Sequence, residues 1–180
     1  MNNFDSCHLV LAGPRAVGKS TIGRALSKAW SRPFIDLDDQ VLASFAEPSV
    51  TQVWAIHGED AWREAECREL EQALGAQPSI MALGGGVPSI PQAARLLNEA
   101  RRNGRAFVVW LQADPGILAS RLSISPGDRP SLTGAAPSEE MAQVCEARAE
   151  AYRAISDLAL DVGEGSPESI VETLASISRP

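Results

Sequence analysis

Short runs of apolar residues alternate along this chain with stretches in which apolar residues recur every three or four positions. The runs have the length of buried strands, and the three-to-four-residue recurrence is typical of amphipathic helices. Strands are therefore expected at residues 7–13, 33–38, 79–86, 106–112 and 158–162, and helices at residues 19–30, 59–74, 91–102, 114–122, 138–155 and 167–178.

This alternation predicts an α/β fold. Strands separated by helices are joined by right-handed crossovers, which give a parallel sheet with helices on both faces. A chain of 180 residues suits one hydrophobic core. We therefore expect a single domain over residues 1–180 with a five-stranded parallel sheet. Residues 123–138 are rich in Gly, Pro and Ser and are predicted to form a long loop, which in a compact domain is usually functional or disordered.

Composition narrows the classes of partner. The formal charge of −7 argues against binding to nucleic acid or to a membrane surface, although a basic pocket for a small anion is compatible with it. No apolar stretch approaches the roughly 20 residues of a membrane-spanning helix, and the N-terminus has no signal-peptide pattern. The three cysteines, Cys7, Cys67 and Cys145, are scattered, which predicts reduced thiols in a cytoplasmic protein and no zinc site. A monomer is expected, since no long unpaired apolar face is evident.

The strongest motif is "GPRAVGKS" at residues 13–20, which matches G-x-x-x-x-G-K-[ST] between a predicted strand and a predicted helix. In such a phosphate loop, backbone N–H groups and the helix N-terminus surround a polyphosphate. The lysine reaches the β- and γ-phosphates, and the serine hydroxyl binds Mg²⁺. The predicted nucleotide-binding residues are Gly13, Pro14, Arg15, Ala16, Val17, Gly18, Lys19, Ser20 and Thr21.

Two further observations concern the backbone of this loop and the class of protein that carries it. Ala16 stands where many such loops carry glycine, and if the backbone there needs a positive φ, alanine costs about 1 kcal/mol. Switch GTPases identify guanine with an N-K-x-D motif, but the only lysine besides Lys19 is Lys28, which lies within a predicted helix. A GTPase of that type is therefore disfavoured.

Carboxylates follow the second predicted strand in "DLDD". Alternation along an extended segment would place Asp36 and Asp38 on one side. A phosphoryl transferase needs one carboxylate near Mg²⁺ and another to orient or deprotonate the acceptor hydroxyl. The alternative is that these acids only stabilise a helix N-terminus, and Asp39 is expected to do no more than that.

Two further clusters could bind an acceptor. Arg63 and Glu66 lie one turn apart on a predicted helix and could address one ligand together, or Arg63 could form a surface ion pair with Glu59. The glycines Gly84, Gly85 and Gly86 follow the third strand and would let a ligand approach the backbone closely.

Taken together, "FIDLDD", "GEDAWREAE", "ALGGG", the "DRP" within residues 123–138 and "RAEAY" near the end of a helix resemble the shikimate kinase family, over most of the chain. The resemblance implies ATP-dependent phosphorylation of the 3-hydroxyl of shikimate, on the way to chorismate and the aromatic amino acids. It also implies ATP and Mg²⁺ as cofactors and shikimate as the partner.

The resemblance assigns roles to individual residues. Asp38 would contact the shikimate hydroxyls and act as base, and Asp36 would hold Mg²⁺ through water, beside Ser20. The substrate would be held within an acceptor-binding segment of about residues 38–66 and beyond it, and a mobile lid at about residues 123–138 would close over it. The remaining implied contacts are Arg63, Glu66, Gly84, Gly85, Gly86 and Arg148 to shikimate, Lys19 and Arg129 to the transferring phosphate, and Arg121 to adenine.

Some positions depart from the family pattern. Trp54 and Trp62 stand where phenylalanine is usual, and Ser131 stands where the lid usually has leucine. The tryptophans could change the acceptor pocket or simply fill the core. Two alternatives to shikimate phosphorylation follow: a kinase of another small hydroxy acid, polyol or nucleoside monophosphate, and a catalytically silent relative that senses shikimate.

Overall fold

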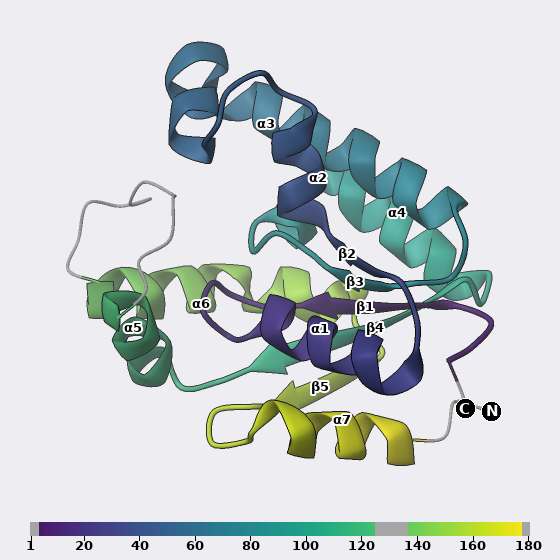
Figure 1. Cartoon of the computed structure of the whole chain (residues 1–180). Coiled ribbons are helices and arrows are strands. Elements are labelled where there is room, and N and C mark those ends of the chain that lie inside the picture. The colour runs from purple at the N-terminus through teal and green to yellow at the C-terminus, as the bar shows by residue number, and fades with distance from the viewer. Residues whose placement is uncertain (1–3, 125–136, 178–180) are drawn as a thin grey trace.

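A parallel sheet with the strand order β2-β3-β1-β4-β5 forms the centre of the computed structural model, which describes residues 4–124 and 137–177 (Figure 1). The strands are β1 (His8–Ala12), β2 (Phe34–Asp36), β3 (Ile80–Ala82), β4 (Ala106–Gln112) and β5 (Leu158–Asp161). The helices are α1 (Lys19–Trp30), α2 (Leu37–Ala43), α3 (Val50–Gly75), α4 (Pro91–Arg102), α5 (Pro115–Ile124), α6 (Pro137–Ile155) and α7 (Pro167–Ser176), with a short 3₁₀ turn η1 (Val87–Ser89). The predicted parallel α/β architecture is confirmed.

Each face of the sheet is covered by its own hydrophobic core, because successive residues of a strand point to opposite faces. In β1, Val10 and Ala12 belong to the core shared with α3 and α4, whereas Leu9 and Leu11 belong to the core shared with α1 and α7. Figure 1 shows these two helical layers above and below the sheet. Because β1, β2 and β3 run parallel, their carboxyl ends lie at the same edge of the sheet, where ligands of such sheets bind.

The expected strand at residues 33–38 is wrong beyond Asp36. The strand ends there, and α2 begins at Leu37. The Asp36 side chain caps this helix by accepting a hydrogen bond from the Asp38 backbone N–H at 3.2 Å. Asp38 therefore lies in the first helical turn, and the strand-alternation argument for its direction does not apply.

The helix expected at residues 59–74 is longer at its N-terminal side. It begins at Val50, where the Ser49 side chain accepts a hydrogen bond from the Gln52 backbone N–H at 3.2 Å. Gly58 interrupts it with φ 83° and ψ 168°. The predicted start at residue 59 thus coincides with the second of two helical segments that meet at this kink.

Both ends of the segment predicted as a loop at residues 123–138 are helical instead, because α5 extends to Ile124 and α6 begins at Pro137; the prediction for residues 125–136 lies outside the described residues. Asp114 stabilises the start of α5 by accepting a hydrogen bond from the Gly116 N–H at 2.8 Å. Arg129 and Ser131 lie outside the described residues.

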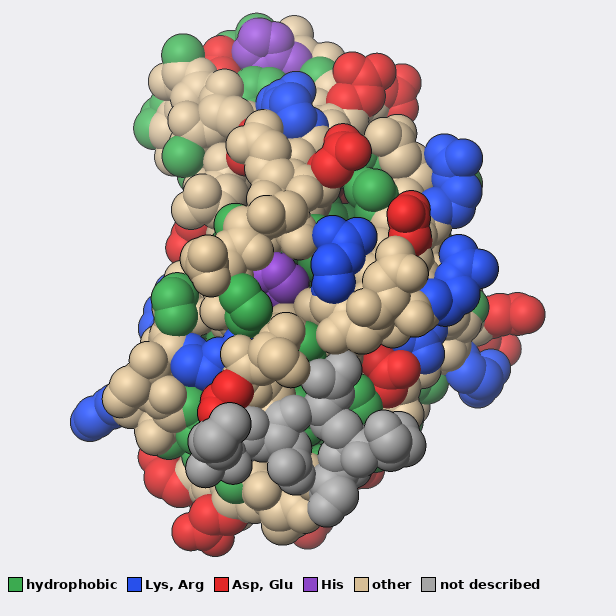
Figure 2. All heavy atoms as spheres, turned by 90° about the vertical axis from the view of Figure 1, so that its right-hand side faces the viewer, with side chains coloured by type: hydrophobic (Ala, Val, Ile, Leu, Met, Phe, Trp, Pro, Cys, Tyr) green, Lys and Arg blue, Asp and Glu red, His purple; other side chains and the backbone are tan. Residues whose placement is uncertain are grey.

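The face turned toward the viewer in Figure 2 carries acidic and basic side chains intermixed, with hydrophobic side chains in small separate groups. Within the described residues, no helix combines the length and the apolar character needed to cross a bilayer.

His8 gives the fold a predicted pH dependence. Its side chain is buried, and Nδ1 accepts a hydrogen bond from the Ser79 N–H at 3.2 Å. Burial and the charge of Arg32 lower the pKa of His8 below its usual 6.5. The unfolded chain therefore takes up the proton first, so the free energy of unfolding should decrease as the pH falls below about 6.5, by at most about 1.4 kcal/mol per pH unit.

Urea unfolding between about pH 7.5 and pH 5.5 measures this slope. His8→Asn retains a side-chain acceptor but does not titrate, so it should flatten the slope in this interval. An unchanged slope in that variant would contradict the role of His8.

Candidate active site

The phosphate loop connects β1 to α1 and is shaped by its own backbone and by Lys19. Gly18 precedes α1 with φ 104°, a conformation that favours glycine. The Lys19 ammonium group donates hydrogen bonds to the carbonyls of Gly13 at 2.9 Å and Pro14 at 2.8 Å. The loop is thereby folded around the residue that the motif assigns to phosphate binding.

Ala16 adopts φ 61°, the left-handed conformation in which a side chain costs about 1–2 kcal/mol. We expect Ala16→Gly to raise the free energy of unfolding by about 0.5 kcal/mol, because the greater freedom of glycine in the unfolded chain offsets part of the relief. Urea unfolding measures this change. Ala147→Gly, on the exposed side of α6, should instead lower stability by about 0.5–1 kcal/mol. A comparable loss in both variants would contradict strain at Ala16.

Ser20 and Asp36 bring a hydroxyl and a carboxylate together beside the phosphate loop. The Ser20 hydroxyl donates a hydrogen bond to Asp36 Oδ2 at 2.5 Å. The other oxygen of Asp36 caps α2. One carboxylate therefore links the start of α1, which carries the loop, to the start of α2, which carries Asp38.

The glycine segment after β3 allows the acidic residues to approach closely. A Cβ added to Gly84 would lie 2.5 Å from Asp38 Oδ1 and 2.7 Å from Glu66 Oε1. A Cβ on Gly86 would lie 2.5 Å from an Arg63 terminal nitrogen. These separations are too short for a real Cβ, so a side chain at either position would displace the carboxylate or guanidinium ends that now lie against the glycine backbone.

Arg63 contacts two glutamates and an indole ring. Its guanidinium group donates to Glu66 Oε2 at 2.7 Å and to Glu59 Oε1 at 2.6 Å and 3.0 Å. Burial lowers the pKa of Arg63, but Glu66 and Glu59 outweigh this effect and raise the pKa overall. The Trp54 ring centroid lies 5.8 Å from the guanidinium carbon. The two pairings considered from sequence, with Glu66 and with Glu59, thus occur together.

The two unusual tryptophans differ in their surroundings. Trp62 is fully buried and stacks on Phe45 at 6.1 Å, so it fills the core. Trp54 is only partly buried and contacts Arg63. Of the two, Trp54 is the one positioned to influence an acceptor.

Helix α6 approaches the glycine segment from the other side. Arg148 and Tyr152 both donate hydrogen bonds to the carbonyl of Gly85, at 3.1 Å and 2.7 Å respectively. No role was inferred for Tyr152 from sequence. Its spacing of four residues from Arg148 places both on one helix face and is the signal that could have identified it.

Arg121 connects α5 to the phosphate loop. It donates hydrogen bonds to the carbonyls of Ala16 at 3.4 Å and of Gly163 at 2.8 Å. It also lines two adjoining cavities of about 310 Å³ and 230 Å³. The first is lined by Ala16, Gly18, Lys19, Ser20, Thr21 and Arg121. The second includes the apolar residues Val17, Ile22, Val162 and Pro167.

The described residues predicted for the site thus cluster at the carboxyl ends of β1, β2 and β3. Residues 15–178 match the family model described as shikimate kinase. The shikimate kinase of Rhodopirellula baltica is 34% identical over 170 residues, which cover 91% of this chain and 86% of that protein. The chain belongs to the shikimate kinase family.

Solved structures agree with membership of the shikimate kinase family. The shikimate kinase of Bacteroides thetaiotaomicron superposes with a TM-score of 0.80 at 28% identity, covering 93% of this chain and 96% of that one. The shikimate kinase of Acinetobacter baumannii in complex with shikimate has the same fold, with a TM-score of 0.85 at 22% identity, covering 95% of this chain and 92% of that one.

Proposed function

We propose that the chain is a shikimate kinase, which transfers the γ-phosphoryl group of ATP to the 3-hydroxyl of shikimate in the shikimate pathway. The observation that carries this proposal is the glycine segment 84–86. It contacts Asp38, Glu66, Arg63 and Arg148 and lies beside the phosphate loop, since a Cβ on Gly85 would lie 3.5 Å from the Arg15 backbone nitrogen. Candidate acceptor residues and the candidate phosphate site are therefore adjacent.

The nucleotide is assigned to the two adjoining cavities around Arg121. The polar cavity, with Lys19, Ser20 and Thr21, suits the phosphates, and the apolar cavity, with Val162 and Pro167, suits adenine. On binding, the Lys19 ammonium group exchanges the Gly13 and Pro14 carbonyls for phosphate oxygens. Arg121 lies where the two cavities meet and can contact both parts of the nucleotide.

The acceptor is assigned to the other side of the glycine segment. Arg63 and Arg148 carry the guanidinium groups that can bind a planar carboxylate with paired hydrogen bonds. Asp38 can accept the proton of the reacting hydroxyl, while Glu66 fixes Arg63 from a fully buried position. Arg129 is proposed to contact the transferring phosphoryl group, and residues 123–138 to form the mobile lid that carries it.

Mg²⁺ is proposed at the pair formed by Ser20 and Asp36. A hydroxyl and a carboxylate beside the phosphate cavity match the oxygen ligands that Mg²⁺ prefers. A protein usually supplies only one or two of these ligands, because phosphate oxygens and waters complete the coordination shell. The ion supplies charge neutralisation for phosphoryl transfer when bound. Among the described residues, no group of three or more His, Cys, Asp or Glu side chains forms a dedicated metal cage.

The protein is further proposed to act as a cytoplasmic monomer with one domain over residues 1–180, of which residues 38–66 form the acceptor-binding segment. Scattered cysteines and the intermixed surface charge visible in Figure 2 support this proposal. A small carboxylated alcohol and ATP with Mg²⁺ are then the partners proposed for it.

A coupled assay of ADP release tests the function. ATP and Mg²⁺ are supplied with shikimate, quinate, gluconate or AMP in turn, and turnover is expected with shikimate. Turnover with gluconate or AMP but not with shikimate would replace the proposed acceptor. Tight binding of shikimate without ADP release would indicate a sensor instead of an enzyme.

A further inference from the structure

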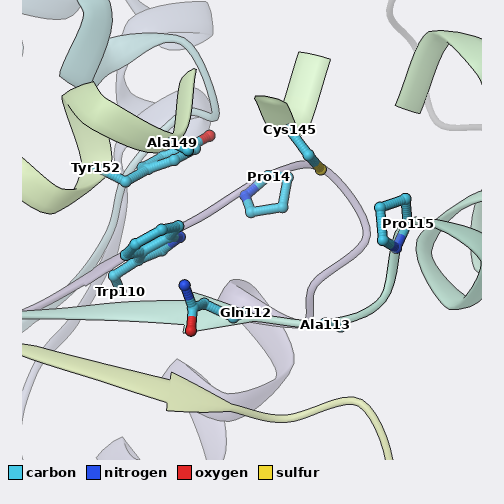
Figure 3. A pocket seen from close by; sticks show the side chains of 8 residues that line it. All are labelled: Pro14, Trp110, Gln112, Ala113, Pro115, Cys145, Ala149 and Tyr152. Carbon is cyan, nitrogen blue, oxygen red and sulfur yellow. The ribbon is translucent and has the colours of Figure 1, made fainter. Parts of the chain in front are cut away.

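A third cavity of about 250 Å³ lies between α6 and the carboxyl end of β4. Among the described residues, it shares no lining residue with the two cavities assigned to the nucleotide. It also has no assigned role in phosphoryl transfer. Pro14 of the phosphate loop forms one wall, and Cys145, Ala149 and Tyr152 of α6 form another (Figure 3).

The walls of this cavity present flat surfaces. Trp110 and Tyr152 stack with ring centroids 5.6 Å apart and an interplanar angle of 19°. Figure 3 shows this pair at one end of the cavity and Pro115 at the other, with Pro14 between them. Aromatic and proline rings arranged in this way favour a planar ligand, which can make extensive contact with them.

The chemistry of the lining favours an uncharged ligand. None of the described residues that line the cavity is Asp, Glu, Lys or Arg, so a charged ligand would lose hydration without gaining an ion pair with any of them. Burial raises the pKa of Cys145, which keeps its thiol neutral at neutral pH.

Gln112 adds one specific polar group. Its carboxamide points into the space between Trp110 and Pro14 (Figure 3). It forms no hydrogen bond with another described side chain or backbone group, so it is available to a ligand. The lining therefore combines apolar surface with one hydrogen-bonding group, as small-molecule sites commonly do.

The volume limits the size of the ligand. A dry cavity of about 150 Å³ in another protein binds benzene. The present cavity, at about 250 Å³, has room for a second fused ring but is smaller than typical sites for drug-sized molecules, which begin near 300 Å³.

We propose that this cavity is a second ligand site, which binds an uncharged, planar molecule of two fused aromatic rings with one hydrogen-bonding atom directed at Gln112. The occupant contacts Pro14 of the phosphate loop and the helix that carries Arg148. It therefore lies against both halves of the proposed active site without filling either.

Quinoline is the probe, because it is bicyclic, neutral at neutral pH and carries one ring nitrogen. Saturable binding to the full chain is expected by isothermal titration calorimetry, with a dissociation constant of about 0.1–1 mM. Quinoline-2-carboxylate should bind at least tenfold more weakly, because none of the described lining residues offers its carboxylate an ion pair. Ala149→Phe, which fills the cavity, should weaken quinoline binding at least tenfold, whereas Ala147→Phe on the exposed side of α6 should change it less than twofold.

Alkylation of Cys145 by iodoacetamide provides a readout on the unmodified protein. Cys145 is partly exposed on the cavity wall, whereas Cys7 and Cys67 are buried. Quinoline should slow alkylation of Cys145 severalfold, as followed by peptide mass spectrometry, both with and without a non-hydrolysable ATP analogue. Absence of saturable binding, equal binding by the Ala149→Phe protein, unprotected Cys145, or displacement by the ATP analogue would each overturn the proposal.

Discussion

Asp38→Asn is expected to lower kcat with shikimate by about 10²–10⁴-fold, because the amide cannot accept the proton of the reacting hydroxyl. Asn and Asp have nearly the same shape, so the contact of this side chain with the backbone at Gly84 is retained. The dissociation constant for ATP should change little, since Asp38 lines neither cavity assigned to the nucleotide. Steady-state kinetics and a nucleotide titration measure the two quantities separately.

Asp39→Asn is the matched control. Asp39 is the next residue of α2, is exposed, and undergoes the same chemical change. Its kcat should stay within about threefold of the parent protein. A kcat for Asp38→Asn within tenfold of the parent value would remove Asp38 from the role of base.

Gly84→Ala is expected to lower kcat/KM for shikimate by about 10²-fold. The added methyl group would lie 2.5 Å from Asp38 Oδ1 and 2.7 Å from Glu66 Oε1, so both carboxylates must move. A displacement of about 1 Å at a reacting group can cost about 10²-fold in rate. The free energy of unfolding should also fall by about 1–3 kcal/mol, because the site is overpacked. Steady-state kinetics and urea unfolding provide the two measurements.

Substitutions at two other glycines serve as controls for Gly84→Ala. Gly75 at the end of α3 has no atom within 4 Å of an added Cβ, so Gly75→Ala should leave kcat/KM unchanged. Gly85→Ala should have a smaller effect than Gly84→Ala, since the atom nearest to its added Cβ, the Arg15 backbone nitrogen, would be 3.5 Å away. A Gly84→Ala protein with kcat/KM within threefold of the parent would show that the close approach is not needed for activity.

The local sequence predicted the helices and strands well where apolar periodicity or a helix-start residue pointed to one structure alone. The bounds of α1, α4 and β4 match the expected ranges, because their apolar periodicity is uninterrupted and Pro91 marks a helix start. The segment after β2 was harder, since Asp36 both ends a strand and caps a helix. Its apolar and acidic residues suit either an extended or a helical continuation, and the helical one was missed.

The candidate site also has one part that could be predicted from local sequence and one part that could not. The phosphate-loop residues are contiguous, so their motif and its position between β1 and α1 could be predicted directly. The partners of the glycine segment could not be predicted from spacing. Asp38, Arg63 and Tyr152 meet at residues 84–86 only because three helices converge on the end of β3.

By itself, the sequence determined the parallel sheet and its helical covering through the order of apolar and polar residues, and the phosphate loop through its motif. Both signals lie within single segments of the chain. Only the tertiary structure decided that Glu59 and Glu66 share Arg63, that Trp62 fills the core, and that Ala16 takes a left-handed backbone. It also decided that a neutral cavity adjoins the phosphate loop. The physical reason is that contact distances and burial arise between segments remote in the chain, whereas hydrophobic periodicity acts within one segment.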